Sequence, residues 1–344
     1  MTYTAHDTEA LTQRIDSELA EVVAAVRKAD PHLRSLILTG GFARGEGMVR
    51  GGVPQNDYDF VAVRGVGRPR EAYSAVRRRL ERRLGLHVDL ACVSAWRLRW
   101  APSSVFWYET ALRGRVLWGD DVLPNIPIRG TADIDPAEGL RLITNRAAGL
   151  LLATETVDAH AVRIQASKAI LAAFDVHLLA AGHFAPSQTE RWHLFQQLLA
   201  ADTAPLELHN DAPLFTWAFR FKTEPAAATE KDPESLWMDA RRVVLEALPV
   251  ALRHAGFSSL EKYGRSDGLL DHVVYNLRVH GAKGAKRFIR SPTGKVRVAT
   301  LRLLEATPER QVNGARAEDC LSGMARVDAT PLRTLEALRG ATLQ

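Results

Sequence analysis

Cysteine is scarce in this chain of 344 residues, which contains only Cys92 and Cys320. The two lie far apart and neither belongs to a Cys-x-x-Cys pair, which argues against a disulfide framework and against a zinc site with the usual ligand spacing. This cysteine usage fits a reducing compartment, and we expect a cytoplasmic protein.

Long apolar runs are also missing. No stretch approaches the roughly 18 apolar residues that a membrane-spanning helix needs. The sequence "GLLLATETVDAHAV" is too short and too polar. The N-terminal "MTYTAHDTEALTQRIDSEL" has no basic region followed by an apolar stretch, so it does not read as a signal peptide. We therefore expect no membrane partner.

Two short segments look like common nucleotide-binding motifs but do not match them. The sequence "SPTGKV" lacks the first glycine and the final Ser/Thr of a P-loop, and "GEGMVRGG" does not match Gly-x-Gly-x-x-Gly. Neither fragment therefore predicts a phosphate site of these kinds.

The composition is that of an ordinary globular protein. Hydrophobic residues make up 46% and charged residues 25%, so a chain of this length can bury a sizeable core and form two domains. Lys and Arg number 45 against 40 Asp and Glu, which gives a net charge of +5. This excess permits phosphate or nucleic-acid partners without requiring them.

The first third of the chain alternates between helical and strand patterns. Apolar residues at three- and four-residue steps predict a helix over 7–28 that Asp7 could cap. A second helix is predicted over 70–84, opened by Pro69 and closed by Gly85. Short apolar runs predict buried strands over 35–39, 57–63 and 87–93. This order indicates an α/β (α+β) core with a mixed sheet.

The rest of the chain reads as mostly helical. We expect a core over 1–125, a link over 125–136 marked by Pro and Gly, and a helical domain over 135–260. The predicted helices of that domain cover 137–156, 159–182, 187–201 and 233–255. We expect residues 261–344 to form a basic segment, largely helical and packed on the helical domain.

Three aspartates lie in the predicted strands. Asp57 and Asp59 are two residues apart in "DYDFVAV" and should share one face, while Tyr58 points to the other. Asp89, in "HVDLACV", would join them if its strand is a neighbour. Carboxylates placed together repel one another unless a cation lies between them, and all-oxygen ligation suits Mg²⁺ or Mn²⁺. We therefore predict one or two divalent ions at this position.

A glycine pair follows the first predicted strand. Gly40 and Gly41, in "LILTGGFARGEG", would let backbone N–H groups approach a phosphate with no Cβ in the way. Arg44 could clamp the same phosphate. An ion pair between Arg44 and Glu46 is the alternative for that arginine. A phosphate cradle facing a dicarboxylate metal site suits phosphoryl or nucleotidyl transfer.

These residues together carry a family resemblance. The series "TGGFARGEG", "NDYDFVAV" and "HVDL" resembles the signature of the DNA polymerase β-type nucleotidyltransferase superfamily. That resemblance implies that Asp57, Asp59 and Asp89 are catalytic and bind two Mg²⁺ ions, and that Gly40 and Gly41 hold the triphosphate. The second turn residue is Gly41 where the family more often has Ser, so Thr39 or Ser35 would have to supply a hydroxyl.

The resemblance continues more weakly beyond the third aspartate. The stretch "FWYETALRGRVLWGDDVL" is similar to a piece of small bacterial members that leads into a helical domain. The sequence that follows resembles the helical domain of aminoglycoside-type nucleotidyltransferases, which implies that Lys168 contacts the triphosphate. Residues beyond about 200 carry no resemblance.

The function implied is Mg²⁺-dependent transfer of NMP from an NTP to a hydroxyl of a small molecule, such as a sugar or an aminoglycoside-like acceptor, with release of pyrophosphate. Two alternatives stay open: a toxin-like enzyme that modifies tRNA or a protein, and a catalytically inactive nucleotide-binding relative. The run "RRRLERR" is either a nucleic-acid patch or a solvated helix face. The NTP, the acceptor and the oligomeric state are not predicted.

Overall fold

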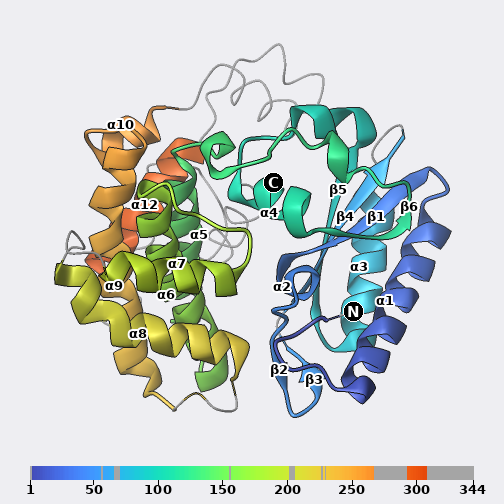
Figure 1. Ribbon diagram of the computed structural model, residues 1–344, viewed down its shortest axis with the longest axis horizontal. Coiled ribbons are helices and arrows are strands. Elements are labelled where there is room, and N and C mark those ends of the chain that lie inside the picture. The colour runs from blue at the N-terminus through green and yellow to red at the C-terminus, as the bar shows by residue number, and fades with distance from the viewer. Residues whose placement is uncertain are drawn as a thin grey trace, which may run out of the picture. The chain divides into compact units, whose positions relative to one another are not determined.

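A computed structural model describes residues 2–55, 57–65, 70–154, 156–200, 206–225, 228, 230–266 and 293–307. The chain divides into two compact units (Figure 1). Unit 1 combines Met1–Asp135 with Gly182–Thr229, and unit 2 combines Pro136–Ala181 with Glu230–Gln344. The break near residue 135 falls inside the link that the Pro and Gly residues mark.

The centre of unit 1 is a mixed sheet of four strands in the order β5-β4-β1-β6. The strands are β1 (Leu33–Thr39), β4 (Asp57–Arg64), β5 (His87–Ser94) and β6 (Arg115–Gly119). Strand β1 pairs antiparallel with both β4 and β6, whereas β4 and β5 are parallel. The mixed α/β character expected from the sequence is confirmed, and so are its three strands.

Helices α1 (Glu9–Ala29) and α3 (Arg70–Leu84) cover one face of this sheet. The apolar stripe of α1, which includes Ile15 and Val22, packs against alternate strand residues such as Leu36 and Phe60. The helical prediction for this region is confirmed, but Asp7 does not cap α1. Thr8 does so by accepting from the Leu11 amide, because the Asp7 carboxylate already accepts from the amides of Tyr3 and Thr4.

Shorter elements complete unit 1. The one-turn helix α2 (Gly40–Arg44) follows β1, and a hairpin of β2 (Val49–Arg50) and β3 (Val53–Pro54) precedes β4. After β5 come η1 (Ala95–Trp100), α4 (Val105–Arg113), β6, η2 (Leu123–Asn125) and η3 (Thr131–Asp133). Helices α7 (Gln188–Ala200) and α8 (Leu206–Thr223) return to this unit from later in the chain.

Unit 2 is helical throughout its described part. It contains α5 (Glu138–Ala153), α6 (Ala159–Ala180), α9 (Pro233–His254), α10 (Leu260–Gly264) and α12 (Thr293–Ala306). Helices α5, α6 and α9 pack on one another, and the buried Trp237 indole donates to the Leu150 carbonyl at 2.9 Å. No helix in the described residues is long and apolar enough to cross a membrane.

The grouping of helices differs from the sequence analysis in one respect. Residues 182–229 belong with unit 1, whereas we had expected them within a helical domain over 135–260. Polar contacts link α7 to α4 and to the segment after α2 within unit 1. Local sequence patterns cannot predict such long-range contacts. Helix α8 contains Pro213 and was not predicted. Most of the expected C-terminal segment, 261–344, lies outside the described residues.

Candidate active site

The register of the sheet places the aspartates beside the glycine turn. Thr39, the last residue of β1, pairs with Asp59 on β4. Asp59 in turn lies opposite Asp89 on β5, and Asp57 lies opposite His87. The sequence left open whether the strand of Asp89 is a neighbour of the strand of Asp57 and Asp59. The two strands are neighbours, and the end of β1 lies beside the beginning of β4.

The aspartates share one face of the sheet. Tyr58 and Phe60 pack into the core under α1 and α3, and the Tyr58 hydroxyl donates to Glu18 on α1 at 2.7 Å. Since strand residues alternate, Asp57 and Asp59 point to the opposite face. Asp57 and Asp59 are partly buried and Asp89 is exposed. The alternation predicted from "DYDF" is what the fold shows.

Gly40 lies directly against the carboxylate of Asp59. A Cβ built on Gly40 would be 1.9 Å from Asp59 Oδ2, and Gly40 has φ of +67°, which L side chains rarely adopt. Gly41 is less constrained, because its Cβ would lie 3.3 Å from the Glu46 carbonyl oxygen. The first glycine is therefore required both by its backbone conformation and by the close approach of Asp59.

A buried hydroxyl lies on the same face. Thr39 is 2% exposed, and its Oγ1 has no hydrogen-bond partner among the described residues. A buried polar atom without a partner destabilises the fold, and a bound ligand could supply the missing hydrogen bond. Ser35 is also buried, but it lies four residues earlier on β1. Of the two hydroxyls that the sequence offered, Thr39 is the one beside Gly40.

The donor chemistry suits a hard divalent cation, since the three side chains supply only carboxylate oxygens. Among the described residues, no three acidic, histidine or cysteine side chains are gathered closely enough to hold an ion. The backbone register brings the three aspartates to neighbouring positions, and a metal site would require their side chains to turn toward one another. The predicted metal ligands stay a prediction.

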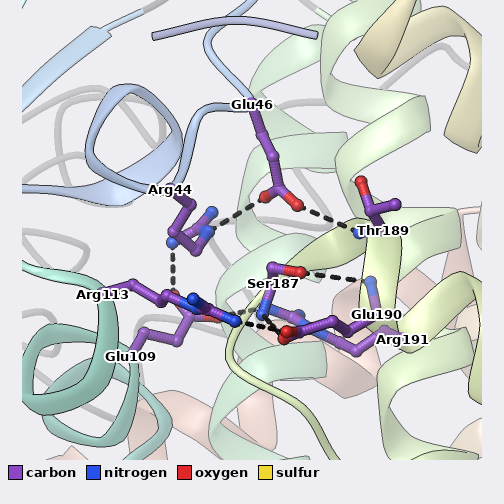
Figure 2. A network of polar contacts seen from close by, with 8 residues as sticks. All are labelled: Arg44, Glu46, Glu109, Arg113, Ser187, Thr189, Glu190 and Arg191. Carbon is purple, nitrogen blue, oxygen red and sulfur yellow. Dashed lines mark hydrogen bonds and ion pairs between the residues drawn. The ribbon is translucent and has the colours of Figure 1, made fainter. Parts of the chain in front are cut away.

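Arg44 is engaged by two carboxylates (Figure 2). Its Nε donates to Glu46 Oε2 at 3.1 Å and its Nη1 donates to Glu109 Oε2 at 2.6 Å. The arginine side chain is 8% exposed and that of Glu46 5%. The ion pair with Glu46 therefore exists, but it is buried rather than on the surface. Arg44 as a phosphate ligand stays a prediction.

The same network ties α7 to α2 and α4. Arg191 forms an ion pair with Glu109, and Glu46 Oε1 accepts from the Thr189 amide at 3.0 Å. At the rim, Arg113 pairs with Glu190 (Figure 2). Helix α7 begins with reciprocal contacts between Ser187 and Glu190, a capping box. The sequence "SQTE" carries that signal.

Lys222 adds a further cation to this network. Burial, and after it the neighbouring Arg44, lower the pKa of Lys222 to about 8, while Glu46 opposes the shift. Burial works to raise the pKa of Glu46, but its interactions, first with Arg44 and then with Lys222, the Thr189 amide and Arg191, together hold the pKa below its usual value. Glu109, Arg191 and Lys222 were not predicted, because no local pattern distinguishes them from solvated helix residues.

Lys168 lies on α6 in unit 2 and is partly buried. The three aspartates belong to unit 1, and the predicted contact of Lys168 with a triphosphate stays a prediction. The described residues that the structure brings together are Thr39, Gly40, Asp59 and Asp89, with Asp57 on the same face.

Comparison with known proteins gives little further information. No protein-family model matches the chain, and no curated protein matches it significantly. Among solved structures, the chain is similar to one described as tri-AMPylated Shewanella oneidensis HEPN toxin in complex with MNT antitoxin. The match has 20% identity and a TM-score of 0.22, and it covers 30% of this chain and 71% of the other. A similarity this weak carries no argument about function.

Proposed function

We propose that the protein is a divalent-metal-dependent nucleotidyltransferase that transfers NMP from an NTP to a hydroxyl group of a small acceptor and releases pyrophosphate. The observation that carries the proposal is the continuous register from Thr39 through Asp59 to Asp89, with Gly40 against the Asp59 carboxylate. This register puts a glycine turn, which could offer backbone N–H groups to a phosphate, beside three carboxylates on one sheet face.

Each residue would have a defined task. Asp57 and Asp59 would hold two Mg²⁺ ions jointly, and Asp89 would hold one of them. Bound there, the ions would neutralise the triphosphate and activate the acceptor hydroxyl. Gly40 and Gly41 would offer backbone N–H groups to the phosphates, and the Thr39 hydroxyl would donate to one of their oxygens. Asp89, the most exposed of the three acids, would accept the proton of the acceptor hydroxyl.

The buried charges around Arg44 would support the turn. Arg44 is the last residue of α2, the helix that starts at Gly40, and the Glu46 amide donates to the Gly41 carbonyl at 2.8 Å. Glu109 accepts a hydrogen bond from Arg44, and Glu46 accepts one from the Thr189 amide. These contacts restrain the segment that would hold the phosphates. Such restraint lowers the entropic cost of binding a triphosphate.

The test is direct detection of transfer. The full-length protein is incubated with each of the four NTPs labelled on the α-phosphate, with Mg²⁺, in the presence of aminoglycosides, other aminosugars or bulk tRNA. The proposal predicts label on a small-molecule acceptor and stoichiometric pyrophosphate, both lost in Asp89→Asn. Label on tRNA or on protein would show that the acceptor is a macromolecule and not a small molecule. No label and no pyrophosphate under any of these conditions would contradict the proposal.

A further inference from the structure

We propose that unit 1 binds single-stranded nucleic acid on a surface at the open edge of its sheet. The β5 edge surface consists of Trp96, Arg97, Arg99 and Trp100 of η1, the turn that follows the last residue of β5. It is separate from the candidate active site, which lies where β4 and β5 begin, because η1 follows the last residue of β5.

The η1 segment displays two tryptophans to solvent. Trp96 is 61% exposed and Trp100 is 78% exposed, whereas Leu98 between them is 1% exposed and anchors the turn. Tryptophan is the largest apolar side chain, and a pair with this exposure is unusual for a surface without a partner. The arrangement presents flat aromatic faces rather than burying them.

Arginines alternate with these rings. Arg97 and Arg99 are both exposed, and the Arg97 guanidinium lies 5.4 Å from the centre of the Trp96 ring. In a 3-10 helix residues three apart are eclipsed, so Trp96 lies in line with Arg99 and Arg97 in line with Trp100. Each of these two aligned pairs thus combines one aromatic ring, on which a base can stack, with one cation.

A basic helix packs against the same strand and adds positive charge to unit 1. Strand β5 is the outermost strand of the sheet, and α3 packs against it. The exposed arginines of α3 are Arg77, Arg78, Arg79, Arg82 and Arg83. Of these, Arg83 pairs with Glu21 at 3.5 Å, and no ion pair of Arg77, Arg78 or Arg79 is found within the described part of the chain. The α3 face therefore keeps an excess of positive charge.

The combination of rings and cations favours one class of partner. Single-stranded nucleic acids are bound by grooves or strips of positive charge that follow the phosphates and by aromatic side chains on which bases stack. A second copy of this chain would bring arginines against arginines, which opposes association. An acidic peptide would satisfy the charges but would leave the tryptophan faces without a planar partner. The run "RRRLERR" of α3 would attract the same polyanion through its positive charge.

The test measures binding of the full-length protein to a labelled RNA of about 20 nucleotides by fluorescence anisotropy. The DNA strand of the same sequence, the corresponding duplex and an Asp/Glu-rich peptide are measured alongside, from about 50 to about 200 mM salt. We expect binding to single strands that weakens steeply with salt. Trp96→Ala/Trp100→Ala should weaken it at least about tenfold, and Arg97→Gln/Arg99→Gln should reduce the salt slope by about 1.4.

Matched controls separate this proposal from the catalytic one. Met238→Ala/Arg253→Gln changes one exposed apolar residue and one exposed cation on α9, and it should leave RNA binding unchanged. Asp57→Asn/Asp59→Asn should also leave it unchanged, so failure of nucleotidyl transfer would not affect this result. Three outcomes would overturn the proposal: no binding at low salt, equal binding of the tryptophan variant with an unchanged melting temperature, or equally tight binding of the acidic peptide.

Discussion

Asp59 on β4 lies directly opposite Asp89 on the parallel strand β5. Like charges on facing strand positions repel one another, and a cation between them would relieve that repulsion. The same face holds Asp57 and the buried Thr39 hydroxyl. The proposed metal and phosphate site rests on this arrangement.

Removing one of the facing charges should stabilise the protein in the presence of a chelator. We predict that Asp89→Asn raises the free energy of unfolding by about 0.5 kcal/mol in urea titrations, because one repulsive pair disappears. Asp239→Asn on α9 is the control and should change stability less. A clear loss of stability in Asp89→Asn would mean that the carboxylate has a structural partner and would weaken the assignment.

Gly40 and Gly41 should differ sharply in their tolerance of a side chain. Gly40→Ala places a methyl group 1.9 Å from Asp59 Oδ2 and imposes a strained φ, so we expect a loss of about 2 kcal/mol together with loss of NTP binding. Gly41→Ala meets only the Glu46 carbonyl oxygen at 3.3 Å and should cost less than about 1 kcal/mol. Urea unfolding and NTP binding compare the two. Equal effects would argue against a special role of Gly40.

The Thr39 hydroxyl should matter for a ligand and not for the fold. Because its Oγ1 has no partner in the described structure, Thr39→Val should keep or raise the free energy of unfolding, by up to about 1 kcal/mol. NTP affinity should fall about tenfold, the loss of one hydrogen bond to a charged group. Calorimetric titration with each NTP measures this, and Thr39→Ser should retain the affinity. Unchanged affinity in the valine variant would exclude Thr39 from the phosphate site.

The buried ion pairs around Arg44 should contribute more to the free energy of unfolding than the exposed ion pairs do. Glu109→Gln removes the carboxylate shared by Arg44 and Arg191, and we expect a loss of about 2 kcal/mol after allowing for partial exposure. Glu190→Gln breaks the solvent-exposed pair with Arg113 and should cost less than about 1 kcal/mol. Thermal and urea unfolding measure both variants. A loss of similar size in both would show that burial does not strengthen the network.

Lys222 gives the stability a defined pH dependence. Its pKa of about 8 in the folded protein lies below the ordinary value of 10.5, so the unfolded chain binds this proton more tightly. The resulting penalty is complete below pH 8 and is relieved as the pH rises toward 10.5. Lys222→Met should therefore be more stable than the wild type at pH 7, and its advantage should shrink above pH 8. Lys28→Met, on the exposed face of α1, should show no such trend.

Sequence reasoning found the parts of the site that depend on local patterns. Apolar runs predict the strands that carry Asp57, Asp59 and Asp89, and the glycine pair marks the end of β1. The residues it missed act over long separations. Glu109 meets Arg44 from 65 positions away, and Arg191 comes from a helix that packs on the core only in the folded chain.

Local competition explains the smaller errors. Asp7 has the right chemistry to cap α1, but the preceding turn takes its carboxylate and Thr8 caps instead. Helix α8 was missed because Pro213 interrupts its pattern, and tertiary packing outweighs that propensity. Whether a residue caps a helix or continues it depends on neighbours that the local sequence does not identify.

The most direct measurement is the melting temperature of the full-length protein with ATP, CTP, GTP and UTP, each with and without Mg²⁺. A ligand that binds the native state alone must raise the melting temperature. The account predicts a Mg²⁺-dependent rise with at least one NTP that disappears in Asp57→Ala/Asp59→Ala. A folded wild-type protein that shows no rise with any NTP, or a rise that survives in the double variant, would contradict it.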